Sequence, residues 1–295
     1  MKIGNKFSFL FILLFIVIIA GCGGDKGSDP VNPANKIIAI NGVYYKGTMG
    51  SNVLDKKLQF AVTDGEGNYI SNQVIQLAQF DGNGSVPSST RTNSTGIAEF
   101  EYEFSGTESV ARILLQVDTI RLEIHIRADA LIPGAGGQAS YVLLSDRYSG
   151  VKNFLGNPAI VDIVPGDHPI IYANYESALG VVVMLYDQDL DKTVYDTSSV
   201  YGVIVNTIYD GQTQTTPPIG IGSTLNELRT AYGDPDEINN TPPRPATEVR
   251  YYALPAAFYC HWQIGMTDTL IEEIHFLRPK MNLHLNQTIK RAMPA

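Results

Sequence analysis

Few residues in the chain combine the type and the spacing that catalysis requires. The strongest candidate is the run Tyr259-Cys260-His261-Trp262, because a thiolate beside an imidazole can act as a nucleophile. The surrounding residues predict a strand, however, and neighbouring residues on a strand point to opposite faces, so Cys260 and His261 cannot share a proton directly. A free cysteine in such a segment usually behaves as a small buried apolar residue. We therefore predict a core cysteine and no catalytic residue.

The chain also has one segment that resembles a calcium loop in its first half. Asp187-Gln188-Asp189-Leu190-Asp191 places carboxylates at the first, third and fifth positions. The sixth position is Lys192 where an EF-hand needs glycine, and the twelfth is Ser198 where it needs glutamate, so a solvated hairpin tip fits better. The other possible ligands are single histidines without the spacing of a zinc site: His125, His168, His275 and His284. We predict no metal and no cofactor.

The clearest chemical signal lies near the N-terminal end. Lys2 and Lys6 precede an almost wholly apolar run, residues 7–20, which Gly21 and Cys22 follow. A basic start, a short apolar run and small residues at its end describe an export signal. The run Ile19-Ala20-Gly21-Cys22 resembles the lipobox of bacterial lipoproteins. That resemblance implies cleavage before Cys22 and a diacylglyceryl group on its thiol.

A transmembrane helix is the alternative interpretation of this segment. A bilayer needs about 20 apolar residues, whereas this run is shorter and residues 21–24 interrupt it with three glycines. Each buried methylene of an acyl chain contributes about 0.8 kcal/mol, and stable anchoring takes two chains or signals. Two or three chains on Cys22 therefore predict a lipid-anchored protein of the cell envelope. Gly23 and Gly24 lack the aspartate of the familiar inner-membrane retention signal, which favours the outer membrane or the cell surface.

Charge and cysteine content exclude several partners and linkages. The sequence has a net charge of −9, and removal of residues 1–21 takes away two lysines and leaves −11. An acidic chain repels phosphate backbones, so we expect no nucleic-acid partner. With Cys22 modified, Cys260 has no partner for an intramolecular disulfide, and each domain must depend on its apolar core.

Residues 23–36 predict a tether. They contain three glycines, two prolines and no aromatic residue, so they cannot bury enough surface to fold. Fourteen such residues have a mean reach of roughly 20 Å, which is enough to clear a lipid headgroup layer.

Apolar and polar residues alternate between residues 36 and 130, and a period of two indicates half-buried strands. Turn-forming clusters separate the alternating segments, and no segment has a helical period. About seven short strands in this length predict a β-sandwich. The alternating apolar positions are Leu58, Phe60 and Val62; Ile75 and Leu77; Ile97, Phe100, Tyr102 and Phe104; Ile113, Leu115 and Val117; and Leu122, Ile124 and Ile126.

Three motifs in this region resemble the group 1 bacterial immunoglobulin-like domain of invasin and intimin. They are the turn Asp64-Gly65-Glu66-Gly67-Asn68, the strand start at residues 72–77 and the segment Thr92-Asn93-Ser94-Thr95-Gly96-Ile97-Ala98. We expect Gly67 and Gly96 to adopt turn conformations that side chains with a Cβ avoid. The resemblance covers about a third of the chain, and it implies a rod-like spacer or adhesive module rather than an enzyme.

An internal repeat follows a Pro- and Gly-containing segment at residues 131–138. Residues 148–158 align with residues 225–235 at a shift of 77, and the same shift pairs Tyr175 with Tyr252. Each copy starts with a short helix that ends at Gly156 or Gly233, and strand-like runs follow. Thr224 and Glu227 form a capping box at the start of the second helix. This order predicts two tandem α+β domains, each with a helix packed on an antiparallel sheet.

The repeat resembles a small helix-over-sheet module found in two families. The residues that carry the resemblance are Gly222-Ser223-Thr224 and the Gly-Asn-Pro and Gly-Asp-Pro runs that begin at Gly156 and Gly233; the first copy lacks the Gly-x-Thr opening. One family comprises the lipoproteins of the outer-membrane barrel-assembly machinery, and the other is β-lactamase-inhibitor protein. The resemblance implies a protein-binding module without catalytic residues.

Tyrosines are concentrated in the repeat region. Twelve of the sixteen lie between residues 139 and 280, and tyrosine serves both in cores and at binding surfaces. We expect the aligned residues Tyr175 and Tyr252 to be core residues. Three tyrosines without an aligned aromatic partner are our candidates for a binding surface: Tyr195, Tyr201 and Tyr209.

The predicted fold is mainly β plus α+β. We divide the chain into a signal peptide (1–21), the lipidated cysteine with its tether (22–36), an immunoglobulin-like sandwich (37–130), a linker (131–138), two α+β copies (139–212 and 213–280) and a tail (281–295). We predict a non-enzymatic, lipid-anchored envelope protein that acts in binding, adhesion or scaffolding, with the sandwich as spacer, the tandem unit as recognition end and a protein as partner.

Two alternatives remain open at this stage. The resemblance to an inhibitor implies that the tandem unit could inhibit an envelope hydrolase. Surface polysaccharide could instead be bound or cleaved on tyrosine platforms, but cleavage needs a pair of carboxylates at a suitable separation, and adjacent acids such as Glu272-Glu273 point to opposite faces of a strand.

Overall fold

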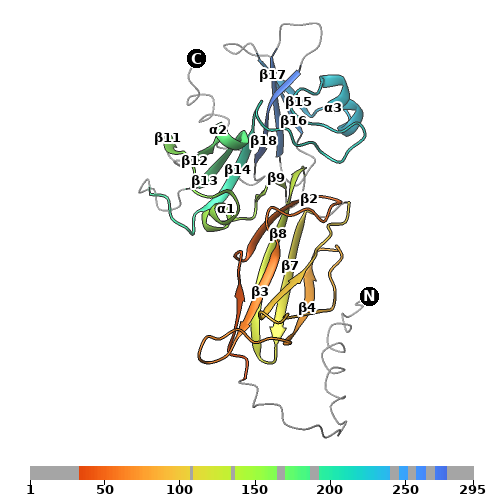
Figure 1. The fold of residues 1–295 in the computed structure, drawn as a ribbon. Coiled ribbons are helices and arrows are strands. Elements are labelled where there is room, and N and C mark those ends of the chain that lie inside the picture. The colour runs from red at the N-terminus through yellow and green to blue at the C-terminus, as the bar shows by residue number, and fades with distance from the viewer. Residues whose placement is uncertain are drawn as a thin grey trace, which may run out of the picture. The chain divides into compact units, whose positions relative to one another are not determined.

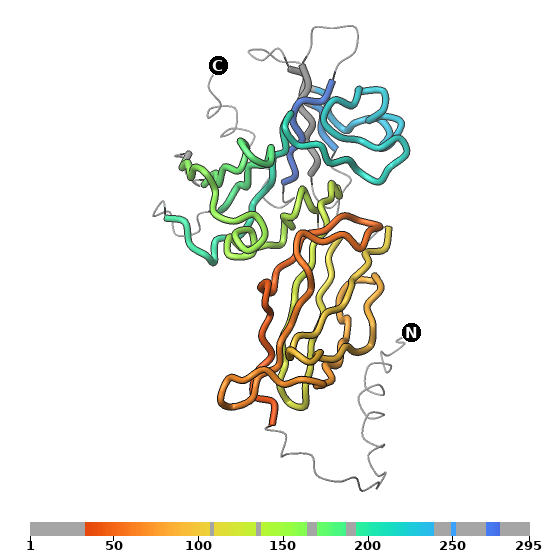
Figure 2. The backbone as a smooth tube through the Cα atoms, viewed as in Figure 1, coloured from red at the N-terminus to blue at the C-terminus, as the bar shows by residue number. Residues whose placement is uncertain are grey.

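The computed structural model describes residues 33–106, 109–133, 137–164, 170–186, 193–239, 246–251, 257–263 and 270–277 (Figures 1 and 2). Contacts group the described residues from Ala34 onward into one compact unit. Several predictions lie outside the described residues: the signal and Cys22, most of the tether, Asp187–Asp191, Tyr252, and the tail 281–295. The side chains of residues 257–263, which include Cys260 and His261, also lie outside this description.

The N-terminal part of the compact unit is a β-sandwich, and its strands are mostly antiparallel. One sheet has the order β1-β3-β6, and the other contains β2, β8, β7, β4 and β5, with β2 parallel to β8. Buried side chains of both sheets form one core. The strands are β1 (Lys36–Ala39), β2 (Tyr44–Thr48), β3 (Leu58–Thr63), β4 (Val74–Asp81), β5 (Ser89–Arg91), β6 (Ile97–Phe100), β7 (Val110–Val117) and β8 (Ile120–Ile132).

The alternating pattern predicted the long strands of this sandwich correctly. β3, β4, β7 and β8 contain the predicted alternating positions, and their buried residues are apolar except Thr63 of β3. β6 ends at Phe100, although Tyr102 and Phe104 beyond it are still buried. The pattern did not identify β5, which is only three residues long and polar.

The two predicted glycine turns are confirmed. Gly67 has a φ of 88° and Gly96 a φ of 78°, in the region that residues with a Cβ rarely adopt. At Gly96 a Cβ would lie 2.5 Å from the Cβ of Tyr69. In the first turn, Oδ1 of Asp64 accepts hydrogen bonds from the backbone N–H groups of Glu66 and Asn68, both at 2.9 Å.

Both ends of the segment predicted as a linker, residues 131–138, belong to paired strands. β8 continues to Ile132 and pairs with β9 (Gln138–Ser140), so that Leu131 faces Ala139 across the ladder. Leu131 and Ala139 are buried in the same core as the C-terminal sheet. A hairpin and a linker share the same proline and glycine signal, which is why composition did not distinguish them.

β9 pairs with β10 (Val142–Leu143), and both extend the larger sheet of the sandwich. The described strands from β11 onward form one antiparallel sheet that combines strands from both predicted copies. Among the described residues the strand order is β11-β12-β13-β14-β18-β17-β16-β15, and β14 pairs with β18 at its centre. The prediction of a separate sheet for each copy is therefore corrected. The elements are β10 (Val142–Leu143), α1 (Tyr148–Leu155), β11 (Ile160–Val164), β12 (Ile170–Tyr175), α2 (Glu176–Leu179), β13 (Val181–Tyr186), β14 (Ser199–Val205), α3 (Leu225–Tyr232), β15 (Glu237–Asn239), β16 (Ala246–Tyr251), β17 (Ala257–Gln263) and β18 (Leu270–Leu277).

Helices α1 and α3 each pack beside this sheet and end in the same way. The N–H of Gly156 bonds to Lys152 and that of Gly233 to Arg229, and both glycines have a φ near 80°. The capping box predicted for α3 is confirmed: the Thr224 side chain accepts from the Glu227 N–H at 3.2 Å, and Glu227 accepts from the Thr224 N–H at 2.8 Å.

A tyrosine hydrogen bond also occurs twice. The hydroxyl of Tyr175 donates to the Gly156 carbonyl at 3.0 Å, and the hydroxyl of Tyr251 donates to the Gly233 carbonyl at 2.9 Å. The counterpart of Tyr175 is therefore Tyr251, not Tyr252 as the constant shift predicted. The segment between helix end and tyrosine is one residue shorter in the second half.

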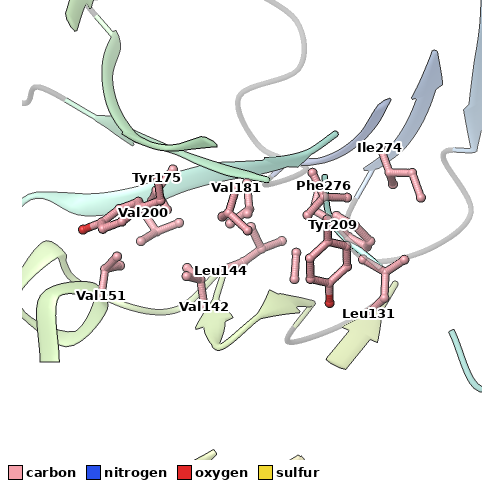
Figure 3. Packing of buried hydrophobic residues seen from close by; sticks show 14 of the residues in the cluster. Leu131, Val142, Leu144, Val151, Tyr175, Val181, Val200, Tyr209, Ile274 and Phe276 are labelled. Atoms are coloured by element: carbon pink, nitrogen blue, oxygen red, sulfur yellow. The ribbon is translucent and has the colours of Figure 1, made fainter. Parts of the chain in front are cut away.

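The core of the sheet lies between its strands and a layer made of α1, β9 and β10. Figure 3 shows Tyr175, Val181 and Phe276 on the sheet side of this core, with Val142 and Val151 opposite them. Tyr175 is buried, as predicted.

Candidate functional site

Of the three predicted surface tyrosines, only Tyr195 is exposed. The exposed fraction is 43% for Tyr195, 1% for Tyr201 and 5% for Tyr209. Tyr201 packs with Met184, Ile204 and neighbouring side chains in a small second cluster of the sheet. The prediction of a binding surface from all three is therefore corrected, because lack of an aligned aromatic partner does not imply exposure.

Tyr209 instead forms part of the connection between β8 and the C-terminal sheet. Its hydroxyl donates a hydrogen bond to Oδ1 of Asp129 at 2.8 Å. Burial raises the pKa of the Asp129 carboxyl, and burial together with the neighbouring carboxylate raises the pKa of the Tyr209 hydroxyl well above its ordinary value. Tyr209 is thus a fixed hydrogen-bond donor in the working pH range.

An ion pair lies near this hydrogen bond. The Arg127 guanidinium donates to both carboxylate oxygens of Asp146, at 2.6 and 2.8 Å, and it also donates to the Tyr141 carbonyl. The two side chains are 11% and 9% exposed. The guanidinium lies over the ring of Phe154 at 4.2 Å from the ring centre. These contacts connect β8 to α1. Because the guanidinium and the carboxylate already bind each other, they suit a rigid connection rather than a catalytic site.

The exposed apolar side chains of the C-terminal sheet are concentrated on β11. Ile160 is 55% exposed, Val161 42% and Ile163 36%, and Asp162 between them is also exposed. Since neighbouring residues of a strand point to opposite faces, β11 presents apolar side chains on both faces. In the described part of the chain β11 pairs only with β12, from Ile160↔Asn174 to Val164↔Ile170. We call the outer side of Ile160–Val164 the β11 edge.

The opposite edge of the sheet differs in length and charge. β15 has three residues, against five in β11. Glu237 on β15 lies 3.2 Å from the guanidinium of Arg250 on the adjacent strand β16. Ile238 is the exposed large apolar residue of β15. Short edges discourage pairing with other chains, so in the described part of the chain β11, with more residues and three exposed large apolar side chains, is the more open edge.

The described residues contain no candidate metal centre. No group of three or more potential metal-ligating residues occurs in the ranges given above. Cys260 and His261 are consecutive positions of β17, opposite Ile274 and Glu273 of β18. Within the same ranges, no helix has the length and apolar character needed to cross a membrane.

Comparison with known proteins gives neither a family nor a curated relative: no family model and no curated protein matches the chain. Three solved structures share 12% identity and a TM-score of 0.24 with it. The D00–D0 domain of intimin is matched over 34% of this chain and 48% of that fragment, so the match spans about half of it. A 282-residue C-terminal fragment of intimin, solved in complex with the intimin-binding domain of the translocated intimin receptor, is matched over 82% of this chain and 99% of that chain. Invasin, described as a bacterial integrin-binding protein, is matched over 83% and 54%. At this TM-score we transfer neither fold nor function from these proteins.

Proposed function

We propose that the chain is a non-enzymatic, lipid-anchored protein of the cell envelope that acts in binding. The sandwich is the spacer, and the C-terminal sheet is the recognition end. The single observation that carries this proposal is the β11 edge, where Ile160, Val161 and Ile163 are exposed on a strand whose outer side pairs with none of the described strands. Exposed apolar residues that cluster in this way mark interaction sites more often than single ones do.

The anchor is proposed from the lipobox at Ile19-Ala20-Gly21-Cys22. Mass spectrometry of the mature protein is expected to show an N-terminal cysteine that carries acyl chains. Cys22→Ser is expected to move the protein out of the membrane fraction. An unacylated terminus, or an unchanged membrane fraction in the variant, would contradict the anchor and the envelope location.

We base the proposed domain organisation on contacts that occur once in each half of the C-terminal region. Residues 139–212 and 213–280 are interpreted as two copies of one helix-and-strands unit, because the glycine caps and the tyrosine bonds of α1 and α3 recur about 77 residues apart. A second pair of bonds supports this interpretation: the Val200 N–H donates to the Asp146 carbonyl, and the Ile271 N–H donates to the Ser223 carbonyl. The two copies then share one sheet through β14 and β18.

Photo-crosslinking in living cells tests the binding role. A photoreactive residue is placed at Ile160, Ile208 or Ile238 in the C-terminal region, and at Tyr69 or Phe80 in the sandwich as matched exposed controls. We expect a discrete adduct from the first group and none from the second. Adducts from the sandwich positions alone would reverse the roles of the two regions. Turnover of ester, peptide or glycoside substrates that is lost in Cys260→Ala or His261→Ala would overturn the non-enzymatic role.

Inhibition of an envelope hydrolase is a second candidate, and the duplicated helix-and-strands unit favours it. The full mature chain is assayed at nanomolar concentration against the hydrolases of the native envelope. Inhibition that saturates at one molecule of this chain per enzyme would specify the binding role as inhibition.

A further inference from the structure

The β11 edge has the properties of a strand that accepts another strand. Natural proteins protect edge strands by short length, charged side chains, proline or bulges. β11 has five residues, Ile-Val-Asp-Ile-Val, with Asp162 as the single charge and no proline, and its pairing with β12 runs without a register shift. An added strand would pair with backbone groups on the outer side and would cover apolar side chains on both faces. This inference rests on the proposed binding role and specifies its mode.

A second copy of this chain fits the edge poorly. Directly opposite residues of an antiparallel pair share a face, so a twofold pairing of two β11 strands must centre on one residue. If the pairing is centred on Asp162, the two Asp162 carboxylates lie directly opposite each other. Centred on Val161 or Ile163, it sets Asp162 against an apolar residue, Ile160 or Val164. Each of these three registers therefore leaves both carboxylates without a favourable partner.

The charge of the edge indicates what does fit. Asp162 is exposed, and none of the described residues forms an ion pair with it. Opposite charges directly across a strand pair stabilise it. We propose that the β11 edge binds an extended segment of a partner protein by strand addition, with a lysine or arginine opposite Asp162 and apolar residues beside Ile160, Val161 and Ile163.

The first test uses two fluorescent peptides and the full mature chain. The probes are Thr-Val-Thr-Val-Lys-Val-Thr-Val-Thr and its counterpart with glutamate in place of lysine, and fluorescence anisotropy measures their binding. Because a cross-strand pair of opposite charges is modest in strength, we expect the lysine peptide to bind about two- to fivefold more tightly. Asp162→Lys is expected to reverse this preference. Equal binding of both peptides, or a preference that Asp162→Lys leaves unchanged, would overturn the proposal.

Two proline variants test whether the backbone takes part. The N–H groups of neighbouring strand residues point to opposite sides, so one of Val161→Pro and Asp162→Pro removes an outward N–H, while the other breaks the pairing with β12. We expect the variant that keeps its thermal transition to lose at least about tenfold in peptide affinity. A folded proline variant that binds as well as the original chain would contradict strand addition.

Other occupants are distinguished by separate outcomes. Sedimentation that shows a dimer of the mature chain, dissociated by Asp162→Lys, would identify a second copy and overturn the proposal. Peptide binding that appears only after removal of residues 278–295 would identify the chain's own C-terminal segment and also overturn it. If crosslinks from Ile208 or Ile238 persist in the folded proline variant and the peptides do not bind, strand addition fails while the proposed binding role stands.

Discussion

The sandwich and the C-terminal sheet place their apolar residues differently. In the sandwich two sheets face each other, and the alternating residues of β3, β4, β7 and β8 bury their apolar side chains between them. The C-terminal region has a single broad sheet with helices beside it, and its outermost strand β11 leaves three large apolar side chains exposed. The sandwich therefore hides its apolar face between two sheets, whereas the C-terminal sheet leaves apolar side chains exposed along one edge.

The largest expected effects test whether the two regions are one cooperative unit. Phe60 is buried in the sandwich and stacks on Phe100 at 5.4 Å, and Phe276 is buried in the sheet. Phe60→Ala and Phe276→Ala should each lower the free energy of unfolding by about 3–5 kcal/mol. Calorimetry is expected to show one transition that both substitutions shift, because β8 belongs to both cores.

The exposed residue Val53 provides the control for these substitutions. Val53→Ala should change the free energy of unfolding by no more than about 0.5 kcal/mol. Two separate transitions, each moved by only one of the phenylalanine substitutions, would show that the regions unfold independently.

The ion pair between Arg127 and Asp146 tests the connection itself. Asp146→Ala leaves a nearly buried guanidinium without its carboxylate, so we expect a loss of about 3 kcal/mol in denaturant unfolding. The double variant Arg127→Met/Asp146→Leu should lose less than the single one, since it removes both charges. A double variant as unstable as Asp146→Ala, or more so, would assign the effect to packing on Phe154 rather than to the charge.

The helices α1 and α3 beside the sheet differ at their N-terminal ends, and we expect smaller effects on stability there. Thr224 caps α3, but Arg147 at the start of α1 makes no side-chain cap bond. Thr224→Ala should cost about 1 kcal/mol, and Arg147→Ser should add about 0.5 kcal/mol, as measured by urea unfolding. A lower free energy of unfolding in Arg147→Ser would show that the Arg147 side chain stabilises the fold in a way other than capping.

The buried carboxyl of Asp129 should make the stability of the protein depend on pH. Burial raises the pKa of its carboxyl above the ordinary value of 3.8, so the stability that this group contributes is present below that value and is lost as the pH rises through the folded-state pKa. Asp129→Asn keeps an acceptor for Tyr209. We therefore expect the variant to gain stability relative to the original chain at about pH 7 but not at about pH 3. Urea midpoints that differ equally at both values would contradict this assignment.

The sequence predicted those features that depend on neighbouring residues. Alternation located β3, β4, β7 and β8, the Thr224 and Glu227 spacing located a helix start, and Gly96 located a turn. The burial of Tyr209 was missed because its partner Asp129 is 80 residues away in the sequence. The β11 edge was missed for a related reason: no strand was predicted at Ile160–Val164, where Asp162 interrupts the apolar residues, and periodicity does not show which strand lies at the border of a sheet.

The parallel pairing of β2 with β8 has a mechanical consequence. Five residue pairs, from Tyr44↔His125 to Thr48↔Asp129, join the first strand of the larger sandwich sheet to the strand that leaves for the C-terminal region. If the N-terminal end is held by lipid and the C-terminal sheet by a partner, tension enters the sandwich through β1 and β2 and leaves it through β8. Parallel strands pulled from their opposite ends slide along each other, so the hydrogen bonds between them share the load instead of opening one at a time. Such a geometry resists traction along the strands.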